Sequence, residues 1–270
     1  MNTAAAAKAA YPAAKTFRVG SVSYLNAKPL IQGLEDDPHI DLRLAVPAML
    51  LDGLISGQLD IALLPVIDYQ RLRDGRIVPA GGIGCDGPTL TVRIFSRKPI
   101  ETIDALACDS ESRTSVALAR IVLAEQFGIR PKLVDWPGQN RDVDAMLLIG
   151  DKVVTREPRG FDHQLDLGAA WKDLTQKPFV FAVWTTRLGI DLGDLPDRLR
   201  QARESGLRDL PNIVAQHAVA HGWPSDLALK YLSAYLKFEI GPPQLDAIRL
   251  FHDLAARHGI IPPPLPLTLY

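Results

Sequence analysis

A short, uninterrupted apolar run early in the chain most constrains the fold. Residues 61–64 (Ile-Ala-Leu-Leu) are apolar at every position and end at Pro65. A strand of this kind is typical of a parallel sheet that is buried on both faces. Two β-prone segments, 17–23 and 41–46, precede it and alternate with helices that are expected to begin at prolines. The order strand–helix–strand–helix–strand predicts an α/β fold with a largely parallel sheet.

The rest of the chain predicts two lobes, one of them discontinuous. No linker or shift in composition divides the chain in half, although the segments after Leu195 change from strands to helices. We therefore predict a disordered tail over 1–16, a first lobe built from 17–95 and 186–270, and a second lobe over 96–185. Two extended crossings between the lobes would form a hinge over a cleft.

Composition narrows the class of partner. Lys and Arg total 30 and Asp and Glu total 31, which gives a formal net charge of −1. Broad neutralisation of nucleic-acid phosphates needs a basic excess, so no nucleic-acid partner is expected. No apolar stretch reaches the roughly 18 residues of a membrane span, so no membrane partner is expected. A small molecule remains the default partner.

The sequence predicts neither a metal nor a cofactor. The two cysteines, Cys85 and Cys108, stand far apart rather than in a zinc-binding or disulfide-rich pattern. Glycine-rich nucleotide motifs, a nucleophile elbow and an HExxH motif are all absent. His217 and His221 are spaced for one face of a helix, but no third ligand accompanies them.

Polar residues gather where the first strand ends. Ser21, Ser23 and Asn26 precede a predicted helix start, and ligands bind at this edge of open α/β sheets. Their hydroxyl and amide groups suit an anion or a polar ligand. The alternative is that they only cap the turn and the helix.

Two further segments could carry chemistry. Thr91 lies early in a strand that follows a Gly-Pro turn, although it is equally compatible with a structural role. Ser112, Arg113, Thr114 and Ser115 precede a long predicted helix, and hydroxyls with an arginine at a helix N-terminus form a natural carboxylate receptor. The competing interpretation is a well-capped helix with a surface arginine.

Acidic residues mark the remaining positions of interest. Asp109 and Glu111 weaken the electrostatic case for that receptor if they point inward. Asp151 follows the buried strand 145–149 and either faces the cleft or caps the next helix.

The aromatic segment 178–184 suits a hinge strand or the wall of an apolar pocket, and core packing is the simpler interpretation for Phe179 and Phe181 individually.

Taken together, these segments resemble one family. Residues 18–30 (Arg-Val-Gly-Ser-Val-Ser-Tyr-Leu-Asn-Ala-Lys-Pro-Leu) are similar to the opening signature of the chorismate dehydratases of the futalosine pathway of menaquinone biosynthesis. The further similar segments follow in the family's order and are 59–65, 86–88, 112–116, 148–151, 166–168 and 178–184. The resemblance covers about 17 to 187 and implies a two-lobed fold like that of type II periplasmic binding proteins.

The resemblance also implies the chemistry. Chorismate would lose water to give 3-[(1-carboxyvinyl)oxy]benzoate, without a cofactor. Asn26 matches the family's active-site asparagine, and Thr91 stands where the family often has serine. An amide is a poor base, so we hypothesise that the substrate's own side-chain carboxylate takes the ring proton while Asn26 and Thr91 orient it. Asp151 is the reserve candidate for the base, followed by His163.

Other functions remain compatible with the same fold. The runner-up is a non-catalytic solute-binding protein for a small carboxylate, and a third option is the ligand-sensing domain of a regulator. The alanine-rich start is interrupted by Lys8 and reads as a tail rather than a secretory signal. The expected location is therefore cytoplasmic, and the sequence leaves open a monomer or a homodimer.

Overall fold

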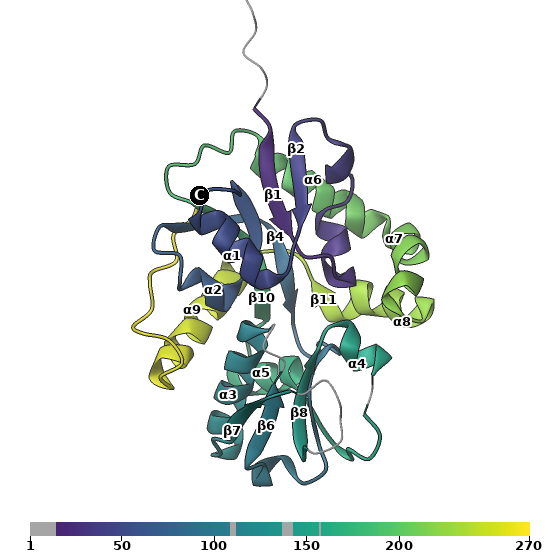
Figure 1. Ribbon diagram of the computed structural model, residues 1–270, viewed down its shortest axis with the longest axis vertical. Helices are drawn as coiled ribbons and strands as arrows, with labels where there is room; N and C mark the ends of the chain where they lie inside the picture. Colours follow the sequence, from purple (N-terminus) through teal and green to yellow (C-terminus); the bar gives the residue numbers. More distant parts are fainter. Residues whose placement is uncertain (1–14, 109–111, 137–142, 157) are drawn as a thin grey trace, which may run out of the picture.

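The computed structural model describes residues 15–108, 112–136, 143–156 and 158–270, and these form two sheets, each with its own helices (Figure 1). The first sheet has six strands in the order β11-β4-β10-β3-β1-β2. Its strands are β1 (Phe17–Ser21), β2 (Ile40–Leu44), β3 (Ile61–Pro65), β4 (Gly75–Cys85), β10 (Phe179–Arg187) and β11 (Leu236–Lys237). The second has five strands in the order β7-β6-β8-β5-β9. Its strands are β5 (Val92–Ser96), β6 (Ala105–Cys108), β7 (Lys132–Asp135), β8 (Ala145–Ile149) and β9 (His163–Asp166).

The helices divide in the same way. Those that accompany the first sheet are α1 (Pro47–Ile55), α2 (Val66–Tyr69), α6 (Leu195–Arg208), α7 (Leu210–His217), α8 (Ser225–Lys230) and α9 (Pro242–Arg257). Those that accompany the second are α3 (Arg113–Phe127), α4 (Asp151–Thr155) and α5 (Leu167–Thr175). Short 3₁₀ segments are η1 (Leu25–Leu30), η2 (Leu34–Asp36), η3 (Ile100–Thr102) and η4 (Val219–His221), and η5 (Tyr231–Tyr235) is a π-helical turn.

The α/β prediction is confirmed, but the sheets are mixed rather than largely parallel. The opening strands β1, β2 and β3 pair in parallel as predicted. β10 enters the first sheet antiparallel to both β3 and β4, because the chain returns to this sheet from the opposite direction after the second lobe. The 11-residue strand β4 is absent from the sequence prediction, since its glycines and Pro79 hide the usual strand pattern.

The sheet to which each strand belongs indicates where the chain passes from one lobe to the other. β5 already belongs to the second sheet, and β10 already belongs to the first. The chain therefore passes between the sheets within 86–91 and again within 176–178, earlier than the predicted limits 95/96 and 185/186. On this basis we propose that the second lobe begins with the turn 89–91, because Asp166 of β9 accepts from Thr89 N and Leu90 N and Gly150 N donates to Thr91 O.

A helix start and a helix end follow from local sequence. Pro47 is the first residue of α1, where a missing N–H costs no hydrogen bond. α3 ends at Gly128, whose φ of 66° is the left-handed conformation that glycine adopts without steric cost. Both positions match the sequence prediction.

The two lobes share a hydrophobic core on the side of α9. Val66 and Ile77 of the first lobe, Leu106 and Leu118 of the second, and Phe251 of α9 belong to one cluster of buried side chains. Burial of apolar surface across the junction stabilises one arrangement of the lobes. The junction also contains the cavity described below, which is lined by both polar and apolar residues.

His252, on α9, makes stability depend on pH. Its ring stacks on Tyr69, Nε2 lies 2.8 Å from the Val66 carbonyl oxygen, and Nδ1 lies 2.8 Å from Gln70 Nε2. Burial lowers its pKa to about 4 from the ordinary 6.5, so the folded ring stays neutral where the unfolded ring takes up a proton. The free energy of unfolding is expected to fall by up to about 3 kcal/mol as pH drops from 6.5 to 4.

Denaturant unfolding at several pH values measures this effect. His252→Gln removes the titrating group, so its free energy of unfolding should depend less steeply on pH over the same window. Equal pH slopes for the variant and the wild type would contradict the assignment.

Candidate functional site

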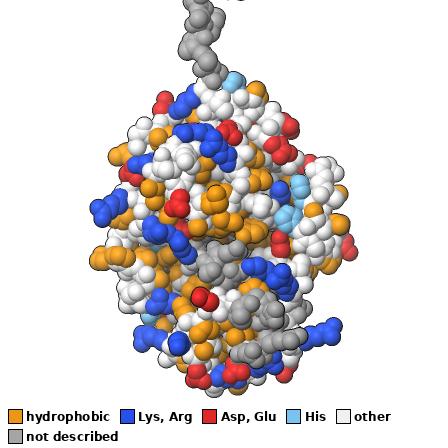
Figure 2. Space-filling view, viewed as in Figure 1, with side chains coloured by type: hydrophobic (Ala, Val, Ile, Leu, Met, Phe, Trp, Pro, Cys, Tyr) orange, Lys and Arg blue, Asp and Glu red, His pale blue; other side chains and the backbone are white. Residues whose placement is uncertain are grey.

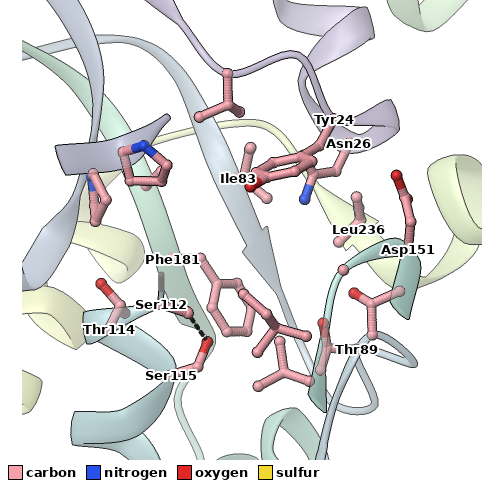
Figure 3. A pocket seen from close by; sticks show the side chains of 18 of the residues that line it. Tyr24, Asn26, Ile83, Thr89, Ser112, Thr114, Ser115, Asp151, Phe181 and Leu236 are labelled. Atoms are coloured by element: carbon pink, nitrogen blue, oxygen red, sulfur yellow. Dashed lines mark hydrogen bonds between the residues drawn. The ribbon is translucent and has the colours of Figure 1, made fainter. Parts of the chain in front are cut away.

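A cavity of about 220 Å³ lies between the lobes and is lined by residues of both (Figure 3). Cavities between two lobes are common binding sites for small molecules. The polar or titratable residues that line it are Tyr24, Asn26, Thr89, Thr91, Ser112, Arg113, Thr114, Ser115, Asp151, Lys152 and Tyr231. The apolar lining includes Val22, Leu63, Ile83, Phe181 and Leu236. Seven of the nine predicted site residues therefore meet in one cavity.

Asn26 reaches the cavity from the first lobe on η1. Leu25, Ala27 and Leu30 of η1 are buried in the core, which leaves Asn26 on the side of the cavity. Its Oδ1 is buried and has no hydrogen-bond partner within the described part of the chain. An unpaired buried acceptor costs free energy, so this atom is suited to accept a hydrogen bond from a ligand.

Thr91 reaches the cavity from the second lobe through a strained turn. Leu90 has a φ of 65°, which is rare for a residue with a side chain, and strain of this kind clusters at functional sites. Asp166 stabilises the turn, because its carboxylate accepts hydrogen bonds from Thr89 N at 3.0 Å and from Leu90 N at 2.8 Å. The same carboxylate also caps α5. Thr91 is thereby held in place, with its Oγ1 2.9 Å from the Tyr231 hydroxyl.

The start of α3 provides the predicted hydroxyl cluster. Ser112 occupies the N-cap position without capping the helix, and its Oγ instead donates to Ser115 Oγ at 2.8 Å (Figure 3). The positive end of a 15-residue helix therefore faces the cavity together with two hydroxyls. Asp109 and Glu111, which were expected to weaken this receptor, lie outside the described residues.

Arg113 and Thr114 line the cavity but are engaged with the first lobe. Arg113 Nη1 lies 2.9 Å from Asp68 Oδ1, and Thr114 Oγ1 accepts from Ile67 N at 3.4 Å. Burial raises the pKa of Asp68, and the guanidinium of Arg113 opposes that rise. The charge of Arg113 is thus shared with a carboxylate, which leaves the helix terminus, the hydroxyls and Lys152 as the other features of the lining that suit an anion.

Asp151 lies at the cavity margin and connects the two lobes. Its Oδ1 accepts from Trp223 Nε1 at 2.7 Å, and its Oδ2 lies 2.8 Å from His221 Nδ1. Both partners belong to the first lobe, whereas Asp151 begins α4 of the second. These contacts support a role in holding the lobes together, and a role as the catalytic base stays a prediction. His163, the other reserve base, is on β9 and does not line the cavity.

Ser21 and Ser23 are not brought into the cavity. Side chains alternate along an extended chain, and it is Val22 and Tyr24 that line the cavity. Ser21 is fully buried, with its hydroxyl directed to the Val22 carbonyl oxygen at 3.4 Å, and Ser23 is exposed. The expectation that these two serines contact a ligand is therefore not supported by their positions.

Several lining residues escaped the sequence analysis. Phe181 lines the cavity, whereas Phe179, two residues earlier, is buried in the core. Regular alternation would place both on one face, but the pairing of β10 with β4 has an irregularity between Val180 and Ala182. Tyr231 comes from the C-terminal helices, far from the other segments along the chain, and nothing in its local sequence marks it. Thr89 shares a strained turn with Thr91, and the left-handed residue between them was not foreseen.

Charges of both signs are mixed on the face of the molecule that Figure 2 shows. Figure 2 shows basic and acidic side chains interspersed over one side of the molecule, in keeping with the net charge of −1. Within the described ranges, His, Cys, Asp and Glu form no group of three that could hold a metal ion. The described helices include none that is long and apolar enough to cross a membrane.

Comparison with protein families decides the assignment of the chain. A family model described as menaquinone biosynthesis matches residues 17–257. This chain belongs to that family. The menaquinone-biosynthesis protein is also 29% identical over 260 residues to a chorismate dehydratase of Thermus thermophilus, an alignment that covers 88% of this chain and 95% of that one.

Solved structures confirm the predicted fold of this menaquinone-biosynthesis protein. A protein from Archaeoglobus fulgidus matches with a TM-score of 0.72 at 16% identity, covering 91% of this chain and 98% of that one. The alkanesulfonate-binding protein of Xanthomonas axonopodis matches with a TM-score of 0.68 at 16% identity, covering 95% and 97%. A Candida albicans protein described as having the generic periplasmic binding protein fold matches with a TM-score of 0.64 at 12% identity, covering 92% and 91%. The two-lobed, periplasmic-binding-protein-like fold is thereby confirmed.

Proposed function

We propose that this menaquinone-biosynthesis protein is a chorismate dehydratase, which converts chorismate to 3-[(1-carboxyvinyl)oxy]benzoate and water. The observation that carries the proposal is the meeting of Asn26 and Thr91, from opposite lobes, in one cavity of about 220 Å³. The similarity to a chorismate dehydratase over 88% of the chain supports the same substrate. We further propose a cytoplasmic location, in keeping with the two buried thiols Cys85 and Cys108, and a monomer or a homodimer.

The features around the cavity suit a dianionic substrate. The N-terminus of α3, with Ser112 and Ser115, is suited to one carboxylate of chorismate without a cluster of lysines or arginines. A helix terminus and hydroxyls stabilise negative charge through oriented dipoles, which is why a protein of net charge −1 can bind such a substrate. The apolar lining around Phe181 suits the ring of the substrate.

The reaction needs one proton removed and one hydroxyl released. The proton leaves a ring carbon, its electron pair becomes part of the aromatic ring, and the ring hydroxyl leaves as water. Aromatisation supplies the driving force, so the protein mainly has to position the reacting groups. In our proposal the substrate's side-chain carboxylate takes the ring proton and passes it to the ring hydroxyl, whose C–O bond breaks so that water leaves. Thr91 orients that carboxylate, and the unpaired Oδ1 of Asn26 accepts from the ring hydroxyl and so orients it.

The same cavity would serve a non-catalytic solute-binding protein, so the test must separate binding from turnover. Purified protein is incubated with chorismate, and the product is followed by ultraviolet absorbance and identified by mass spectrometry as chorismate minus water. The Asn26→Ala variant, purified identically, controls for a contaminating enzyme. Chorismate that is bound and recovered unchanged would overturn the proposal in favour of the binding protein.

A further inference from the structure

Tyr231 is a buried titratable residue that lines the cavity. It is 2% exposed and lies at the start of η5, the π-helical turn that follows α8. A π-helical turn inserts one extra residue into a helix and is frequently found at functional sites. Tyr231, the first residue of this turn, is one of the residues that line the cavity.

The ring of Tyr231 is held rigidly from behind. It stacks on Trp223, with ring centroids 4.8 Å apart and an interplanar angle of 20°. Trp223 in turn donates its Nε1 hydrogen to Asp151 at 2.7 Å. The position of the phenol therefore depends on a contact that joins the two lobes.

The hydroxyl of Tyr231 meets Thr91 across the cavity wall. Tyr231 Oη and Thr91 Oγ1 are 2.9 Å apart, and both residues are almost fully buried. A phenol is a stronger acid than an aliphatic hydroxyl and hence the better donor of the pair. Burial raises the pKa of Tyr231, so the phenol keeps its proton at neutral pH. When the phenol donates, the Thr91 hydroxyl hydrogen is left for a different acceptor.

We propose that Tyr231 is a positioning residue: it donates to Thr91 Oγ1 and so directs the Thr91 hydroxyl hydrogen toward a substrate oxygen. This inference rests on the proposed function, because the substrate oxygen is a carboxylate oxygen of chorismate. It explains why a tyrosine from the C-terminal helices packs against a turn of the opposite lobe. Without the phenol, Thr91 Oγ1 would be free to rotate among its hydrogen-bond options.

The test is a double-mutant cycle on chorismate dehydration. Tyr231→Phe keeps the ring stacked on Trp223 and removes only the donor. It is expected to lower kcat by about tenfold while KM changes by less than about threefold, because positioning acts on the reacting geometry more than on binding. In a Thr91→Val background the same change should have no further effect on kcat, since the hydroxyl it directs is gone.

Two further measurements make the outcome decisive. Tyr235→Phe, on the same π-helical turn but outside the cavity lining, should leave kcat and the melting temperature unchanged. Additive effects of Tyr231→Phe and Thr91→Val, or a wild-type kcat for Tyr231→Phe, would overturn the inference while dehydration by the wild-type protein still stood. A wild-type protein that does not dehydrate chorismate would instead refute the proposed function, and this inference with it.

Discussion

Asn26→Ala is expected to lower kcat for chorismate dehydration by more than about tenfold while the protein stays folded. The variant removes Asn26 Oδ1, a buried acceptor of the cavity that lacks a partner within the described residues. Because the flanking Leu25 and Ala27 anchor η1 in the core, the backbone should hold its place. Steady-state kinetics with chorismate measure the effect, and circular dichroism checks the fold.

A matched pair of variants isolates the role of the site. Asn212→Ala removes an asparagine from the exposed surface of α7, where it donates to Asp209, and should leave kcat unchanged. Thr91→Val should also lose more than about tenfold in kcat, whereas Thr91→Ser keeps the hydroxyl and should retain activity. If Asn26→Ala and Thr91→Val both had the wild-type kcat, the proposed roles of these two side chains would be wrong.

Gly206→Ala is expected to destabilise the protein by on the order of 3 kcal/mol or more. Gly206 is on α6, where the backbone of Pro29 in η1 approaches so closely that an added Cβ would lie 2.2 Å from its carbonyl oxygen. Alanine favours a helix over glycine by only about 1 kcal/mol, so the clash dominates. Since α6 supports η1, the displacement should also reach Asn26. Denaturant unfolding measures the stability, and kcat measures the displacement.

A second helical glycine provides the control for that prediction. At Gly53, on α1, an added Cβ would meet the end of the Leu59 side chain at 2.7 Å rather than a backbone atom. A side chain can move aside, so Gly53→Ala should cost clearly less than Gly206→Ala. Equal free energies of unfolding for the two variants would show that the approach of α6 to Pro29 is not a tight one.

Local sequence was sufficient for those elements whose signals are short-range. The apolar run at 61–64 became β3, and the helix that ends at Gly128 became α3, because burial on both faces and a left-handed C-terminal residue are properties of neighbouring residues. The antiparallel entry of β10 and the strand β4 were not predicted. Their pairing depends on residues a hundred positions apart, which no local pattern encodes.

In the candidate site, too, some residues were predicted from local sequence and others depend on tertiary contacts. Asn26, Thr91 and the residues 112–115 were all predicted, because polar groups at strand ends and helix starts mark the cleft edge of an α/β fold. The sequence did not predict which way the side chains of Ser21 and Ser23 point. A shift of one residue along an extended chain turns a side chain to the other face. Asp151 was predicted at a strand end, but its partners His221 and Trp223 were not.

By itself, the sequence determined the fold class, the family resemblance and most of the polar residues around the cavity. Only the tertiary structure decided which of these residues face one another, that Arg113 shares its charge with Asp68, and that Tyr231 completes the environment of Thr91. The physical reason is that secondary structure responds to neighbours along the chain, whereas a cavity between two lobes is formed by contacts between distant segments. The direction of each polar side chain in it depends on those contacts.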